Sequence, residues 1–134
     1  MNRVDFESIK TIAVVGLSNK PDRSSYTVAK YLQDCGYRII PVNPTVDSVL
    51  GEKAYPDIDS IPADIVVDVV DIFRKPQAVM PFVRQAVNRG DVRIIWMQEG
   101  VINEGAAEAA RNSGLEVVMD KCILKAHQKC SLNY

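Results

Sequence analysis

The sequence has few of the side chains on which enzymes most often depend. Its 134 residues include one histidine, His127, and three cysteines. A catalytic site of the serine–histidine or cysteine–histidine type would have to use that histidine, which lies in a polar stretch near the C-terminus. Cys122 and Cys130 flank it at irregular spacing, a poor match to a closed zinc site. We therefore expect no catalytic constellation and no metal site.

Long hydrophobic runs and clustered positive charge are also missing. The most apolar segment, residues 63–73, is interrupted by aspartates and is too short to span a membrane. The net charge is −1 and no basic run exceeds two residues, which argues against a nucleic-acid surface. An odd cysteine count without a secretory signal favours free thiols and a cytoplasmic location.

Two common nucleotide-binding signatures are absent. A dinucleotide fingerprint starting at Gly16 would need two further glycines, at the positions that hold Ser18 and Pro21. NAD sites also use an acidic residue at the end of the second strand, where this chain has Asn43 and Pro44. The Walker pattern GxxxxGK[ST] does not occur either. The sequence thus disfavours an NAD site and the usual ATPase phosphate loop.

The chain does contain apolar strands that alternate with helices, and each helix is followed by a glycine. Short β-branched runs predict strands over residues 11–15, 38–42, 64–70, 93–97 and 116–119, with a short edge strand near 53–55. Helical spacing predicts helices over residues 24–35, about 77–89 and about 103–113. This order is typical of an α/β fold, a Rossmann-like doubly wound and mainly parallel sheet in a single domain, with the first strand central. We expect a core over residues 8–123 and a polar tail over residues 124–134.

Residues of unusual type follow these strands, and ligands of open α/β sheets bind outside the carboxyl ends of strands. The clearest example is the loop that begins at Gly16, a residue that permits a sharp turn. Lys20 and Arg23 bring positive charge to the start of the next helix, where free N–H groups favour anions. The loop therefore predicts a phosphate site. The alternative is an ordinary loop in which Ser24 or Ser25 caps the helix.

Three other positions lie near the same rim. Phe73 is followed by two cations, the first of which is Arg74, and this group could flank a purine and meet a phosphate. Alternatively, Phe73 is a core residue and the cations are solvated. Gln98 could hydrogen-bond a ligand amide or diphosphate. Cys122 comes just after the last strand, where it is either a small buried hydrophobe or a thiol near the ligand.

Seven motifs, taken in order, resemble those of the small stand-alone CoA-binding protein family. They are VVGLS, RSSY, VNP, GEKAYP, DVVDIFR, WMQEG and MDKC. They are also similar to the CoA-binding domain of succinyl-CoA ligase α subunits and ADP-forming acyl-CoA synthetases. The resemblance covers roughly residues 8–128 and implies that coenzyme A lies along the rim, with the first loop facing its phosphates. The ligases have a glycine-rich first loop, where this chain has Pro21, Asp22 and Arg23. They also phosphorylate a histidine in a separate domain, so this chain resembles the binding half alone.

The rim and the resemblance together define a set of predicted CoA contacts. These are Gly16, Leu17, Ser18, Lys20, Arg23, Ser24, Val42, Asn43, Pro44, Val70, Asp71, Phe73, Arg74, Met97, Gln98 and Glu99. We predict a non-catalytic cytosolic protein that binds CoA or acyl-CoA, with no nucleic-acid or membrane partner. Two alternatives stay open. One is an NADP-dependent oxidoreductase, in which Lys20 and Arg23 would meet the 2′-phosphate. The other is an interaction subunit of a CoA ligase. The protein partners that we consider are therefore a ligase chain and, in a homodimer, a second copy of this chain.

Overall fold

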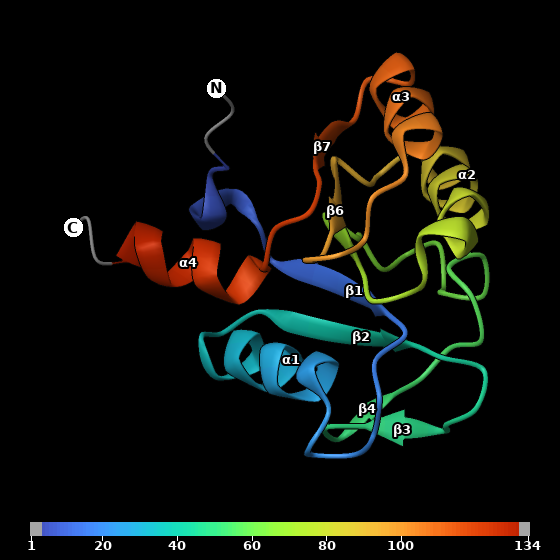
Figure 1. The fold of residues 1–134 in the computed structure, drawn as a ribbon. Coiled ribbons are helices and arrows are strands. Elements are labelled where there is room, and N and C mark those ends of the chain that lie inside the picture. The colour runs from blue at the N-terminus through green and yellow to red at the C-terminus, as the bar shows by residue number, and fades with distance from the viewer. Residues whose placement is uncertain (1–3, 132–134) are drawn as a thin grey trace.

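The computed structural model describes residues 4–131, in which a five-stranded parallel sheet is covered by helices on both faces (Figure 1). Its strands are β1 (Thr11–Val15), β2 (Arg38–Val42), β5 (Val69–Ile72), β6 (Ile94–Met97) and β7 (Glu116–Val118). They are ordered β2-β1-β5-β6-β7, and every neighbouring pair is parallel. The predicted α/β doubly wound fold is confirmed, but the central strand is β5 rather than the first strand, because β1 lies one place off centre, between β2 and β5.

Two pairs of helices cover the two faces of the sheet. They are α1 (Ser24–Asp34) with α4 (Ile123–Ser131), and α2 (Met80–Arg89) with α3 (Glu104–Asn112). Successive residues of β1 alternate between the two cores: Ile12 and Val14 pack beneath α1 and α4, whereas Ala13 and Val15 pack beneath α2 and α3. This explains why β1 is apolar at every position rather than at every second one. Among residues 4–131, no helix is long and apolar enough to cross a membrane.

The predicted strand over residues 64–70 is wrong in its position, because β5 begins only at Val69. Asp68, directly before β5, still bonds to β1, with its N–H donating to the Thr11 carbonyl at 3.0 Å, but the backbone further upstream bonds to side chains at the end of α2. The Arg89 guanidinium donates to the carbonyls of Ile61 and Ile65, and an Asp91 carboxylate oxygen accepts the Val67 N–H at 3.1 Å. The helix after β5 also begins later than predicted, at Met80, with a 3-10 turn, η2 (Pro76–Ala78), before it.

The predicted polar tail over residues 124–134 is also wrong as far as Ser131, because this segment forms helix α4. Ile123 is fully buried, and Leu124, Ala126 and Cys130 pack against the core beneath α1. Their spacing follows one face of a helix, a pattern that the many polar residues between them obscure. Residues 132–134 lie outside the described part of the chain.

The segment predicted as an edge strand near residues 53–55 forms a small hairpin instead. Strands β3 (Ser48–Val49) and β4 (Glu52–Lys53) pair antiparallel with each other, separately from the main sheet. Only Tyr55 reaches the main sheet, through a single parallel bridge to Val42. Pro56 follows at once and cannot donate a backbone hydrogen bond, so the pairing does not extend into a strand.

Candidate functional site

A cleft of about 430 Å³ opens at the carboxyl ends of β1, β5 and β6. The crossover from β1 leads to β2 on one side, while β5 lies on the other, so the cleft occupies the topological switch point of the sheet. Its lining comes from the loop after each of these strands, from the first turns of α1 and from the segment before α4. The lining residues are Gly16, Ser18, Arg23, Ser24, Ser25, Val28, Phe73, Arg74, Gln98, Glu99, Val101 and Cys122.

Gly16 brings the first loop against the end of β5. Its N–H donates to the Val42 carbonyl at 2.8 Å, and its φ of +82° belongs to the left-handed region that favours glycine. A Cβ at this position would lie 2.5 Å from the Phe73 carbonyl oxygen and 3.1 Å from Arg74 Cδ. The close approach of these two loops therefore requires a residue without a side chain.

The loop leaves the N-terminus of α1 open. The N-cap residue is Arg23, which makes no side-chain cap, so the expectation that Ser24 or Ser25 caps the helix is wrong. Ser25 instead accepts the Ser18 N–H at 3.0 Å, and Ser18 Oγ accepts the Lys20 N–H at 3.0 Å. Because the first amides of a helix have no intrahelical partner, this end of α1 presents donors and a positive dipole end to the cleft.

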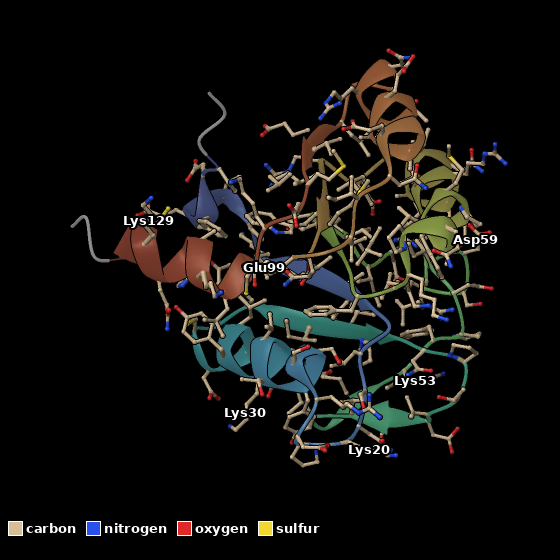
Figure 2. All side chains as sticks on the ribbon, in the orientation of Figure 1. Lys20, Lys30, Lys53, Asp59, Glu99 and Lys129 are labelled. Carbon is tan, nitrogen blue, oxygen red and sulfur yellow. The ribbon has the colours of Figure 1, made fainter. Side chains whose placement is uncertain are left out.

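Positive charge dominates the mouth of the cleft. Arg23 and Arg74 line it, are exposed, and form no ion pair within residues 4–131. Glu99 also lines it but is paired with Lys125 of α4 at 3.2 Å. Figure 2 shows Lys20 out on the loop between β1 and α1, and it is not among the lining residues. Two unpaired guanidinium groups beside a helix N-terminus form a site suited to a phosphorylated ligand.

The floor of the cleft continues the face of the sheet that packs under α1 and α4. Gly16, Phe73 and Gln98 follow β1, β5 and β6, and all three line the cleft. Gln98 is 5% exposed, and its Oε1 accepts the Ile123 N–H at 3.1 Å. This bond joins the cleft floor to the first residue of α4, so the last helix helps to fix the site.

Asp71 lies on β5 in the middle of the sheet and has an unusual environment. It is 0% exposed, and neither carboxyl oxygen has a hydrogen-bond partner in the described part of the chain. Burial raises the pKa of the Asp71 carboxyl well above its usual range, because the charged form would be desolvated without compensation. Ionisation of the Asp71 carboxyl would therefore lower the stability of the folded protein.

Asp71→Asn should stabilise the ligand-free protein against unfolding at neutral pH. The carboxyl ionises freely only in the unfolded chain, near pH 4, so Asp71 loses its contribution to stability as pH rises from about 4 through its folded-state pKa. Asparagine has the same shape and cannot ionise. We expect the free energy of unfolding to rise by about 1–3 kcal/mol at about pH 7 and to change little at about pH 4. Urea unfolding at both pH values measures this, and a less stable variant at neutral pH would contradict it.

Eight of the sixteen predicted contacts line the cleft: Gly16, Ser18, Arg23, Ser24, Phe73, Arg74, Gln98 and Glu99. The other eight are placed elsewhere. Val42, Val70 and Met97 are buried beneath α2 and α3 on the opposite face of the sheet. Leu17 is buried, and its carbonyl accepts a hydrogen bond from the Asn43 amide at 3.0 Å. Pro44 and Lys20 are exposed outside the lining, and Asp71 lies beneath the floor.

Sequence reasoning left four lining residues out of the predicted set. Val28 and Val101 supply apolar surface, and Ser25 fixes the first loop through its hydroxyl. Val28 is one of the apolar residues at helical spacing in α1, and that spacing by itself indicates only a core residue. Cys122 lies in the lining, as its place after the last strand suggested, and is half-buried.

Comparisons with known proteins identify relatives that match nearly the whole of this chain. The uncharacterized protein YneT of Bacillus subtilis is 45% identical over 118 residues, which cover 88% of this chain and 85% of that protein. A hypothetical protein from Pyrococcus horikoshii superimposes with a TM-score of 0.87 at 39% identity, covering 92% of this chain and 84% of that one. The alpha subunit of ADP-forming acetate–CoA ligase II from Pyrococcus furiosus is 25% identical, and the alignment covers 96% of this chain but only 30% of the subunit.

A family model also spans nearly the whole structure. The model described as a CoA binding domain matches residues 10–128, from the residue before β1 into α4. That range contains every residue that lines the cleft. The chain belongs to the CoA-binding domain family.

Proposed function

We propose that this protein binds coenzyme A or an acyl-CoA in the cleft at the carboxyl ends of β1, β5 and β6, without catalysis of its own. The proposal rests on one observation: Arg23 and Arg74 both line the cleft at the uncapped N-terminus of α1. This charge suits the phosphates of CoA. Phe73, Val28 and Val101 offer apolar surface beside it for the adenine ring or the pantetheine arm.

The environment of the single histidine supports a binding role rather than a catalytic one. His127 lies on α4, where its Nδ1 and the Tyr31 hydroxyl are 2.6 Å apart. Phe6 and Tyr37 contact its ring edge-to-face, with centroids 5.2 and 5.6 Å away. Burial lowers the pKa of the imidazole, so the neutral ring is favoured. His127 is not among the residues that line the cleft, and its contacts attach α4 to the rest of the fold.

Calorimetric titration of the purified protein with CoA, acetyl-CoA and NADP⁺ tests the proposal. We expect CoA to bind and NADP⁺ to bind more weakly or not at all, because the chain lacks the glycine fingerprint of dinucleotide sites. Mass spectrometry of small molecules released from gently purified, then denatured, protein would identify a ligand carried from the cell. Absence of CoA binding at about millimolar concentration, a free energy of only about −4 kcal/mol, would overturn the proposal.

Bound CoA should protect the Cys122 thiol from alkylation. Cys122 lines the cleft and is half-buried, whereas Cys35 is exposed at the end of α1. At a CoA concentration about ten times its Kd, we expect alkylation of Cys122 to slow about tenfold, because only the free protein reacts. Peptide mass spectrometry measures both sites in one sample, so Cys35 is the internal control. Equal rates at Cys122 with and without CoA would place the ligand elsewhere.

A second candidate function is that of a binding subunit for a separate CoA ligase chain. The observation in its favour is that the related Pyrococcus furiosus sequence is the alpha subunit of a larger enzyme, of which this chain spans 30%. Affinity purification of the tagged chain from its native cells distinguishes the two functions. A stoichiometric ligase subunit that co-purifies would favour the second function, and CoA binding by the isolated chain with no such partner would favour the first.

A further inference from the structure

Asp71 lies one residue row beneath the floor of the cleft. In β5, Val70 and Ile72 pack beneath α2 and α3, whereas Val69 packs beneath α1 and α4. Because successive side chains of a strand alternate between faces, Asp71 points to the α1–α4 side, as does Phe73 two residues later. Phe73 lines the cleft. The buried carboxyl therefore lies directly inward of a residue that a bound ligand would contact.

The register of the neighbouring strands also places Asp71 one row beneath the floor of the cleft. Asp71 is in register with Val14 of β1 and Trp96 of β6. Two residues further along these strands are Gly16 and Gln98, which also line the cleft. Val14, Asp71 and Trp96 thus form one row across the sheet, and Gly16, Phe73 and Gln98 form the next row outward, which is the cleft floor.

No charged group compensates Asp71 from any element packed on this side of the sheet. Its row is completed by Val14 and Trp96, and the layer above contributes apolar residues such as Val28 and Ile123. The titratable groups on the surrounding elements are Arg23 at the N-cap of α1; Tyr26, Lys30, Tyr31 and Asp34 on α1; Arg74 after β5; Glu99 after β6; Cys122 before α4; and Lys125, His127, Lys129 and Cys130 on α4. None of them perturbs the Asp71 carboxyl, for which burial is the only cause of the raised pKa.

A buried polar group without a partner is rare in folded proteins and calls for an explanation. Every other polar residue buried on this face has a function in the fold: Ser25 accepts the Ser18 N–H, and Gln98 accepts the Ile123 N–H. Among the buried side chains of residues 4–131, Asp71 alone has polar atoms without a partner, and its row borders the floor of the cleft. A partner for it is therefore to be sought in the ligand.

We propose that Asp71 is a proton-linked contact of the cleft, which accepts a hydrogen bond from an uncharged N–H or O–H group of the bound ligand. This inference rests on the proposed function, and in CoA the matching donors are the amide and hydroxyl groups of the pantetheine arm. In the free protein burial favours the protonated form of this carboxyl. When the ligand donor reaches it, the carboxyl releases that proton to solvent and the carboxylate accepts the new hydrogen bond. No covalent bond of the ligand changes.

Calorimetry of CoA binding in buffers of different ionisation enthalpy counts the protons released. For the unchanged protein at about pH 6 we expect release of a fraction of one proton, and affinity that rises as pH rises. Asp71→Asn should release fewer protons on binding CoA than the unchanged protein, should depend less on pH, and should bind CoA about tenfold more weakly. Pantetheine has no phosphate, so it should release a proton from the unchanged protein and none from Asp71→Asn. Adenosine 3′,5′-bisphosphate should release only the protons of its own phosphates, whose second pKa is about 6, and equally with both proteins.

Asp64→Asn is the matched control, because it makes the same substitution at an aspartate that is exposed before β5, at the opposite end of the sheet. This variant should keep the affinity and proton release of the unchanged protein. If the unchanged protein binds CoA and Asp71→Asn has the same affinity and proton count, this inference is wrong while the proposed function stands. If the unchanged protein binds no CoA, the proposed function itself fails.

Discussion

Gly16→Ala is expected to abolish CoA binding and to lower the free energy of unfolding by about 2–4 kcal/mol. Two costs add at this position. The backbone φ of +82° is unfavourable for any residue with a Cβ, and the new methyl group would lie 2.5 Å from the Phe73 carbonyl oxygen. That oxygen belongs to the backbone, so relief requires the loops after β1 and β5 to separate. Chemical unfolding and CoA titration of the same variant measure the two effects.

Gly90→Ala is the matched control for this substitution. Gly90 ends α2 with a φ of +84°, and a Cβ there would meet nothing within 4 Å. It therefore incurs the backbone cost alone, about 1–2 kcal/mol. The difference between the two variants isolates the contact with Phe73. Equal destabilisation of both variants, with CoA binding retained in Gly16→Ala, would contradict the close approach of these loops.

The double variant Arg23→Gln with Arg74→Gln should bind CoA about 100-fold more weakly, since each guanidinium can make a charge-assisted hydrogen bond to phosphate. Both side chains line the cleft and are exposed, so their removal should leave stability nearly unchanged. The affinity of the unchanged protein should also fall with added salt, and that dependence should be weaker in the double variant. Calorimetry at two salt concentrations measures both effects.

Arg84→Gln with Arg111→Gln is the corresponding control, because it removes the same charge from exposed positions on α2 and α3. Equal loss of affinity in both double variants would mean that the overall charge of the protein, rather than the two cleft guanidinium groups, attracts the ligand. Unchanged affinity in Arg23→Gln with Arg74→Gln would place the phosphates outside this cleft.

The sheet was predictable from the sequence because its signal is local. The apolar runs of β1 and β6 contain too few residues for a helix and are bounded by loop residues, so composition alone identifies them as strands. The start of β5 was not predictable, since residues 65–67 are as apolar as β5 itself. Their backbone is bonded by Arg89 and Asp91, which are distant in sequence. Helix α4 was obscured by its polar residues, although Ile123 and Cys130 lie one heptad apart on its buried face.

The sequence predicted which loops form the cleft but not which of their residues line it. Strand order brings the loops after β1, β5 and β6 to one edge, which the motif order indicated. Which side of the sheet each residue faces depends on strand register, and register is not visible in the sequence. Val70 and Phe73 belong to the same motif, yet Val70 packs beneath α2 and α3 while Phe73 lines the cleft. A shift of a single residue exchanges the two faces.

The bond from the Ile123 N–H to Gln98 has a consequence for biosynthesis. The cleft joins the loop after the first strand to the residues that begin the last helix, so almost the whole chain separates its two walls. A nascent chain can form β1, α1 and β2 while still on the ribosome, yet it cannot complete the cleft until α4 has emerged. Ligand capture is therefore expected only after α4 has emerged, and ribosome-bound chains that lack α4 would not compete for the cellular pool of ligand.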